Sequence, residues 1–418
     1  MEIRKVFSTI QDANDEIKNS WEKIYEVSNL LEDKKSSEVA FRRTISYDPS
    51  NQQIISSYAS STNSRIDEVV KAITKILAEF TESIQTNPNN ISQWIIAAHS
   101  YALLGDFTNA YSAYSNVIRL IKDTVIEDPY FWYGVGSVFQ HFNYHKTALQ
   151  YLYTANELTN KLPLSADVNF RIALSHRNLK NYHEAIQYFE LLINTQSYPL
   201  YLTQDDIMFQ LAYTNQLMGK TEIAKHIYNE LYQHNPKNSD IIQQYCWFLL
   251  LQGDDLSVDL AENIINKFNP NEPTLLLILA RIAMKKNKMT LAHNRYCACI
   301  SYWNYSPLFW GGIGVLYFKN EQDQDAIIAF QRAEFVNPDI PEIWLNLALI
   351  FELQEDFPKT MHVYELGIER CSNNEKIRER YAAFQSKRSK PDRSMILEIN
   401  DSKLFPQIAE KISNGFIN

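Results

Sequence analysis

Residues 307–338, PLFWGGIGVLYFKNEQDQDAIIAFQRAEFVNP, contain the pattern that decides the fold. One helical face in its first half alternates bulky and small apolar residues, at Trp310, Ile313, Gly314 and Tyr317. After a polar break, Ala326, Phe330 and Ala333 form the apolar stripe of a second helix. Pro338 ends that helix because proline has no backbone N–H and clashes with the preceding turn. The stretch therefore predicts a pair of antiparallel helices.

This pair resembles a tetratricopeptide repeat, whose signature is W-x2-L-G-x2-Y, A-x3-F and a final P, with Ile313 in place of the Leu. Gly314 and Ala326 supply the small side chains that let two helices approach closely. One such hairpin cannot bury its apolar face alone, so copies must stack.

The chain contains further copies. From residue 91 onward, the residues equivalent to Trp310 are Trp94, Trp132, Asn169, Met208, Ile242, Leu276 and Trp344, and we call this the Trp position. The spacing predicts an all-α protein, a right-handed α–α superhelix of about ten helix-turn-helix repeats. We expect divergent repeats at 1–88, a continuous solenoid at 89–374, a capping helix at 375–388 and a C-terminal tail at 389–418.

The residues after the capping helix form two parts. The sequence SKRSKPDR at 386–393 predicts disorder, and further on an amphipathic helix is expected that docks back or binds a partner, from Leu404, Ile408, Ile412 and Phe416. The basic residues could form a nuclear import signal or a solvated linker: Lys387, Arg388, Lys390 and Arg393.

Composition narrows the class of protein. The net charge of −9 disfavours direct binding to nucleic acid or to an anionic membrane, and the small number of glycines, 10, disfavours nucleotide-cradling loops. The four cysteines form no C-x-x-C pair, and there is no apolar run of about 18 residues. We expect a soluble intracellular protein with reduced thiols.

No pattern in the sequence predicts catalysis or a cofactor. The chain has neither G-x-x-x-x-G-K-[ST] nor G-x-S-x-G, and its carboxylates are scattered. His141 and His145 are four residues apart, but the residue after His141 is not the glutamate that the H-E-x-x-H metal-binding motif requires. The sequence also offers no third metal ligand. Cys297 and Cys299 face different sides of one helix. We expect no metal, no cofactor and no enzymatic activity.

The order of repeat variants resembles one family more specifically. FWYGVG, FRIALS, IIQQYCW, LARIAM and FWGGIGVLY occur in register in successive repeats. They are similar to the tetratricopeptide region of the fungal general corepressor subunit that works with a Tup-type WD40 protein, and the resemblance covers roughly residues 37–374. The region is also similar to that of the UTX/UTY histone demethylases. The resemblance implies a nuclear adaptor whose first repeats hold the WD40 corepressor and whose later repeats meet DNA-bound transcription factors.

In a right-handed stack, the first helix of each hairpin lines the inner surface. Residues one and five positions after the Trp position are therefore candidates for partner contact: Ile95, His99, Tyr133, Ser137, Phe170, Leu174, Phe209, Tyr213, Gln243, Trp247, Leu277 and Arg281. We predict that a protein-binding groove includes Tyr133, Phe170, Phe209, Tyr213, Trp247 and Arg281. The alternative is that these side chains only pack against neighbouring helices.

Three functions remain open at this point. The first is a scaffold of a nuclear corepressor complex. The second is a scaffold of another assembly, such as a cell-cycle ubiquitin ligase or a trafficking complex, and the third is the regulatory region of an enzyme. The first predicts a location in the nucleus.

Overall fold

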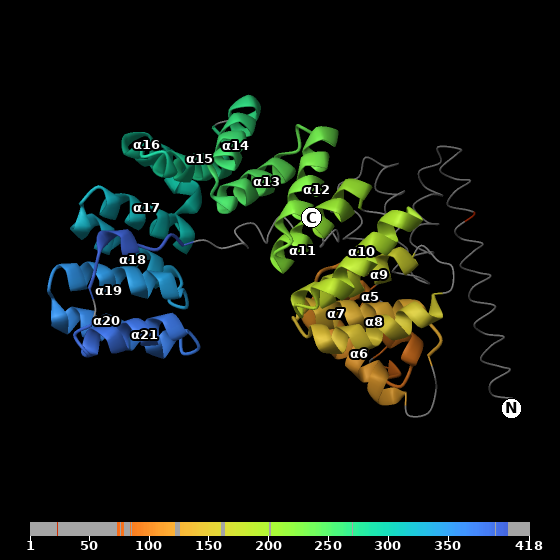
Figure 1. Cartoon of the computed structure of the whole chain (residues 1–418). Helices are drawn as coiled ribbons and strands as arrows, with labels where there is room; N and C mark the ends of the chain where they lie inside the picture. The colour runs from red at the N-terminus through yellow and green to blue at the C-terminus, as the bar shows by residue number, and fades with distance from the viewer. Residues whose placement is uncertain are drawn as a thin grey trace, which may run out of the picture. The chain divides into compact units, whose positions relative to one another are not determined.

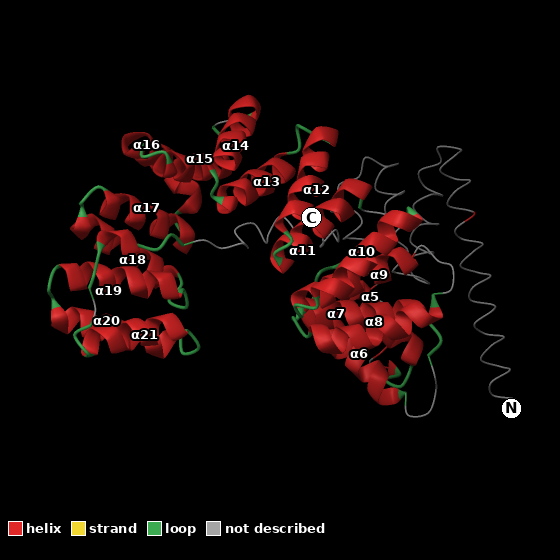
Figure 2. Cartoon of the chain, viewed as in Figure 1, coloured by secondary structure: helices red, strands yellow, loops and turns green. Residues whose placement is uncertain are grey.

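The computed structural model describes residues 86–399, apart from 122–125, 160–163, 200–201, 270 and 389, and a few isolated positions before residue 86. All regular structure in this part is helical, and it contains no strand (Figure 2). The two divergent repeats expected at 1–88 and the helix expected at 404–416 lie outside the described residues, apart from those isolated positions.

The described chain divides into two compact units, one up to Ala224 and one from Lys225, and we describe each by itself (Figure 1). The first unit contains the hairpins α5 (Ile91–Leu103) with α6 (Phe107–Leu120), α7 (Pro129–His141) with α8 (His145–Leu158), and α9 (Leu164–Asn178) with α10 (Tyr182–Thr195), followed by α11 (Gln204–Met218). The boundary falls within α12 (Thr221–His234). A single continuous solenoid over 89–374 stays a prediction.

The second unit continues the same alternation. It contains α13 (Ser239–Gln252) with α14 (Asp255–Phe268), α15 (Pro273–Lys285) with α16 (Met289–Trp303), α17 (Pro307–Lys319) with α18 (Asp323–Val336), and α19 (Pro341–Leu353) with α20 (Phe357–Arg370). The helix expected at 375–388 is α21 (Glu375–Gln385), which packs against α19 and α20. A short 3-10 helix, η1 (Arg393–Met395), follows.

Each hairpin turns at a residue with left-handed backbone conformation, placed eleven residues after the Trp position. These residues have φ between 56° and 83° and are Gly105, Asn143, Lys180, Gly219, Gly253, Asn287, Glu321 and Glu355. A positive φ just after the last helical residue lets backbone N–H groups bond the free carbonyls of the helix end. The constant spacing shows that all eight repeats share one register.

Three of these turns have a residue whose side chain disfavours the left-handed conformation, namely Lys180, Glu321 and Glu355. We expect Lys180→Gly to raise the free energy of unfolding by about 0.5–1 kcal/mol, because glycine has no Cβ to strain this backbone. The matched change Glu190→Gly, at an exposed position inside α10, should lower stability by about 1 kcal/mol. Thermal denaturation of both variants tests the two opposite signs.

Tryptophan at the Trp position ties each first helix to the linker before it. The indole N–H donates to the carbonyl six residues earlier, at 2.7–2.9 Å, in Trp94 to Pro88, Trp132 to Ile126, Trp310 to Asn304 and Trp344 to Pro338. A bulky ring with a polar edge thus covers the hairpin and satisfies a linker carbonyl at once. The remaining hairpins have Asn169, Met208, Ile242 or Leu276 there, which have no indole.

Successive first helices contact one another within each unit, as α5 contacts α7, α7 contacts α9, α13 contacts α15 and α15 contacts α17. Seven second helices, α6, α8, α10, α14, α16, α18 and α20, pack on their own first helix, and all of these except α20 also pack on the first helix of the next hairpin. The first helices α5, α7 and α9 therefore form a row in the first unit, and α13, α15 and α17 form a row in the second. We call the free side of each row the inner face.

Candidate protein-binding surface

The inner face of the first unit contains a buried polar cluster that joins α7 to α9. Tyr133 on α7 donates from its hydroxyl to Asp167 Oδ2 at 2.5 Å and accepts from Arg171 Nε at 2.7 Å. Arg171 Nε also lies 3.9 Å from Asp167 Oδ1, and its guanidinium stacks over the Tyr133 ring at 5.3 Å. Burial raises the pKa of Tyr133 well above its usual value, an effect that Arg171 partly offsets, so the phenol remains a donor.

Gln140, two turns after Tyr133, extends this cluster along the two helices. Its amide oxygen accepts from Arg171 Nη1 at 3.1 Å, and its amide nitrogen donates to the Arg171 carbonyl and to Ser175 Oγ, both at 3.1 Å. Ser137 lies between Tyr133 and Gln140 on the same stripe of α7 and is partly exposed. This stripe of α7 therefore faces α9, the next first helix.

A second polar contact joins α9 to α11. Arg177 donates to the side-chain oxygen of Gln210, and its guanidinium stacks over the ring of Tyr213 at 5.2 Å. All three side chains are buried. Paired arginine and tyrosine side chains on successive first helices make the inner face polar but well packed, which holds these helices at a fixed separation.

The inner face of the second unit starts with a related pair. Trp247 on α13 lies under the guanidinium of Arg281 on α15, at 5.0 Å. Next to it, the Glu272 carboxylate accepts from the hydroxyl of Ser239 at 2.8 Å and from the amide of Gln243. Charged and amide groups again link two successive first helices.

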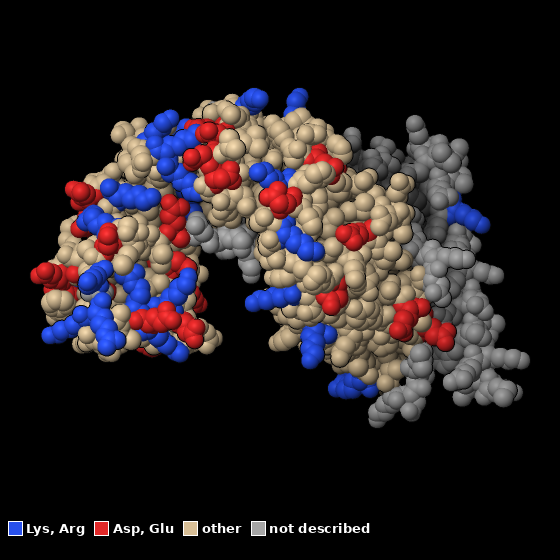
Figure 3. Space-filling model, viewed as in Figure 1, with Lys and Arg blue, Asp and Glu red and all other residues tan. Residues whose placement is uncertain are grey.

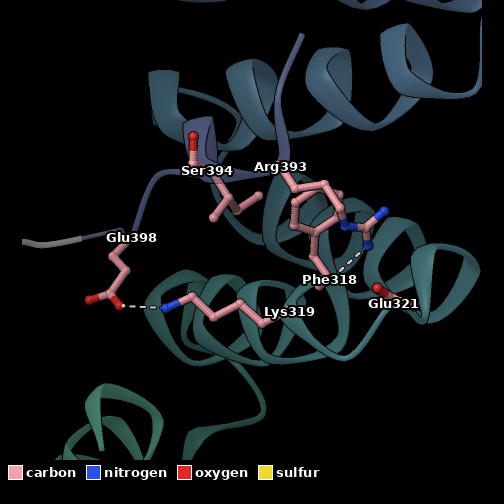
Figure 4. A pocket seen from close by; sticks show the side chains of 7 residues that line it. Phe318, Lys319, Glu321, Arg393, Ser394 and Glu398 are labelled. Carbon is pink, nitrogen blue, oxygen red and sulfur yellow. Dashed lines mark hydrogen bonds and ion pairs between the residues drawn. The ribbon is translucent and has the colours of Figure 1, made fainter. Parts of the chain in front are cut away.

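Further along this face, the chain's own residues 392–399 lie across α17 and α19 (Figure 4). Asn346 on α19 donates to the Leu397 carbonyl at 2.8 Å and accepts from the Leu397 N–H at 2.9 Å. Arg393 pairs with Asp323 at 2.6 Å. The structure thus differs from the disorder expected at 386–393, because Arg393 is held by the carboxylate of Asp323, which is seventy residues away in sequence.

The six predicted groove residues are all buried, at 0–7% exposed: Tyr133, Phe170, Phe209 and Tyr213 in the first unit, and Trp247 and Arg281 in the second. The structure brings Trp247 together with Arg281, and it joins Tyr133 and Tyr213 to arginines on α9. Their contact with an external protein stays a prediction.

Phe170 corresponds instead to the packing alternative. Its ring is 0% exposed and meets Phe189 of the paired helix edge-on, with centroids 6.0 Å apart. A partner could reach it only by opening the hairpin. The sequence also missed Asp167, Arg171 and Gln140, although their polar character on an otherwise apolar helix is a signal that could have located them.

The described residues contain no group of three His, Cys, Asp or Glu side chains arranged to hold a metal ion. Cys299 is buried, and burial raises the pKa of its thiol to about 12, so it remains protonated at neutral pH. None of the helices in the described part of the chain is both long enough and apolar enough to cross a membrane. On the face seen in Figure 3, Lys, Arg, Asp and Glu are interspersed over α17–α21.

Three histidines of the first unit give its stability a pH dependence. Burial lowers the pKa of His141, His145 and His176 below their usual 6.5. Below pH 6.5 the folded chain therefore binds fewer protons than the unfolded chain. The contribution of the three neutral histidines to the free energy of unfolding is complete above pH 6.5 and decreases as the pH falls towards their lowered pKa values. We expect a melting temperature a few degrees lower at pH 5.5 than at 7.5. Replacing all three by Gln should remove most of that difference; an unchanged difference would contradict this assignment.

Models of the tetratricopeptide repeat match three stretches, residues 166–197, 206–238 and 312–364. The chain contains tetratricopeptide repeats. The matches include the α9–α10 hairpin in the first unit and the α17–α18 turn in the second. Together with the uniform hairpins, they confirm the predicted all-α superhelix of tetratricopeptide repeats.

A protein of similar sequence is the general transcriptional corepressor ssn6 of Schizosaccharomyces pombe. It is 31% identical to this chain over 65 residues, which are 16% of this chain and 6% of that protein. The match therefore spans a small fraction of the corepressor's length.

Three solved structures match this chain at low sequence identity. Yeast Tom70 has 14% identity and a TM-score of 0.49, over 95% of this chain and 92% of that one. The APC/C hetero-tetramer Cut9–Hcn1 has 12% identity and a TM-score of 0.46, over 86% and 74%. A tetratricopeptide repeat protein from Parabacteroides merdae has 11% identity and a TM-score of 0.40, over 71% and 98%.

Proposed function

We propose that this chain is a non-catalytic scaffold that holds protein partners on the inner faces of its helical hairpins. The observation that carries the proposal is the way the inner face of the second unit holds a segment of polypeptide, through the side-chain amide of Asn346, which donates to and accepts from the backbone of Leu397. Rigid first helices with fixed polar side chains suit extended peptides or short helices as ligands.

We propose further that the scaffold serves a nuclear transcriptional corepressor complex, in which it binds a Tup-type WD40 corepressor and DNA-bound transcription factors. Two observations support this. The chain is 31% identical over 65 residues to a general transcriptional corepressor, and repeat spellings such as FWYGVG and FWGGIGVLY resemble those of that family in the same order.

Affinity purification of the full-length chain from nuclear extract tests this function. We expect a WD40 corepressor among the enriched proteins. Ser137→Trp, which places a bulky ring on the inner stripe of α7, should reduce its recovery, whereas Leu191→Trp on the exposed side of α10 should not. The proposal fails if the chain stays outside nuclei when nuclear export is blocked, or if ubiquitin-ligase or transport subunits are enriched instead.

A further inference from the structure

The segment Asp392–Ile399, which we call the docked segment, lies against α15, α17, α19 and α21 of the second unit. Near its start, Arg393 contacts Phe318 on α17 and Asp323 at the start of α18. Met395 then contacts Arg380 of α21, and Leu397 contacts Asn346 of α19. Ile399 then lies between α17 and α15. The segment therefore lies on the surface where the repeats of this unit would hold a partner.

The inner face recognises the backbone of this segment. Asn346 is fully buried and forms both hydrogen bonds that a neighbouring β-strand would offer to Leu397. The Ile399 carbonyl accepts from Arg281 Nη2 at 2.9 Å. On the side of the segment these bonds use only main-chain atoms, so another peptide with the same backbone conformation at these two residues can form them.

A small niche accepts the last side chain of the docked segment. Ile399 is 3% exposed, and its terminal methyl occupies the space into which a Cβ on Gly311 would project. The first residue after the Trp position is glycine in this repeat alone among those of the described chain, so the niche is specific to α17. It selects for a branched aliphatic side chain at this point of the ligand.

Charges fix the register of the segment at its two ends (Figure 4). Arg393 pairs with Asp323, donates to the Phe318 carbonyl at 2.7 Å and stacks over the Phe318 ring at 4.2 Å. Glu398 pairs with Lys319 at 3.5 Å. The ligand pattern is therefore an arginine, then a glutamate five residues later, followed at once by an aliphatic residue.

We infer that the inner face of α15, α17 and α19 is a binding site for peptides of the pattern Arg-x4-Glu-Ile that begin with a 3-10 turn and continue as an extended strand, and that the docked segment occupies this site in cis until such a partner displaces it. The inference deepens the proposed function, because it rests on the chain being a protein-binding scaffold. It adds the chemistry of one ligand class and a competitor built into the chain.

Competition from the docked segment sets the size of the expected effect. Only a short linker separates Gln385, the end of α21, from Asp392, so the effective concentration of the segment is about 1 mM. If the docked segment itself has an intrinsic Kd of about 10 µM, its occupancy in cis weakens the apparent affinity of any competing peptide about 100-fold. The native chain should bind such peptides poorly, and a chain with a displaced segment should bind them well.

The test uses a fluorescent synthetic peptide of residues 390–402, titrated against full-length proteins by anisotropy. Ile399→Asp in the protein places a carboxylate in the niche and should release the segment. We expect this variant to bind the peptide at least about tenfold more tightly than the native chain. Equal or weaker binding to the variant would overturn the inference.

Peptide variants give controls that leave the protein unchanged. Methylation of the Leu397 backbone nitrogen removes the bond to Asn346 and should weaken binding to the Ile399→Asp chain at least about tenfold. Met395→Ala in the peptide should have little effect, since Met395 is 42% exposed. Indifference to methylation would overturn the recognition of the peptide backbone by Asn346. Dimerisation of the native chain through this segment would overturn its assignment in cis. Neither result would alter the outcome of the nuclear purification.

Discussion

Replacing Gly314 by tryptophan is expected to lower the free energy of unfolding by about 3 kcal/mol or more. A Cβ at this position would lie 2.8 Å from two atoms of the Phe330 ring, so even the first side-chain atom overlaps the paired helix. Phe330 is fully buried in the α17–α18 hairpin and cannot move aside. Helix propensity acts in the opposite direction, because glycine inside a helix costs about 1 kcal/mol relative to better helix formers.

Thermal denaturation followed by circular dichroism measures this effect. The matched control is Phe335→Trp on α18 of the same hairpin, where the side chain is 91% exposed and an indole meets only solvent. We expect the control to melt within a degree or two of the native chain. Equal or higher stability of the Gly314→Trp protein would show that α17 and α18 do not pack as described.

Replacing Arg171 by methionine is expected to destabilise the first unit by about 3 kcal/mol. The change keeps the volume of the side chain but takes a cation from the buried carboxylate of Asp167 and a donor from Tyr133. The cost arises because a charged group buried beside fewer partners has lost its hydration without full compensation.

A second substitution separates lost charge from lost packing. Asp167→Asn in the Arg171→Met background should restore roughly half of the lost stability, because a neutral amide is cheaper to bury than a carboxylate. Urea denaturation of the native, single and double variants forms the cycle. Additive losses in the double variant would contradict a coupled Tyr133–Asp167–Arg171 cluster.

The hairpins could be predicted from sequence because their determinants are local. Trp310, Gly314 and Phe330 repeat at spacings that only two packed helices satisfy, and these spacings set helix ends to within a few residues. Even a hairpin without tryptophan, such as the one with Asn169 at the Trp position, has its left-handed turn residue eleven residues after that position, as the others do. The repeat supplies the register that a single weak copy does not.

The binding surface could be predicted only in part. Position relative to tryptophan places a residue near the inner face, but it does not give the distance to the next first helix. Phe170 has the position of a groove residue, yet it packs inward against Phe189. In contrast, Tyr133 and Arg171 meet across two helices, and this contact depends on the stacking angle, which sequence periodicity does not encode.

The docked segment could not be predicted from local sequence patterns. Its backbone bonds connect Asn346 with Leu397, 51 residues apart, and Arg281 with Ile399, 118 residues apart. Polar composition around 386–393 predicts disorder because it offers no apolar surface to bury. What orders Arg393 is a carboxylate and an aromatic ring already positioned by the α17–α18 hairpin.

Site-specific photo-crosslinking in the native complex tests the central claim most directly. A photoreactive amino acid at Ser137 is on the inner stripe of α7, between Tyr133 and Gln140, and one at Leu191 is on the exposed side of α10. If the first helices form the partner-binding surface, protein partners will crosslink from position 137 and not from position 191. Partner crosslinks confined to position 191 would contradict the account.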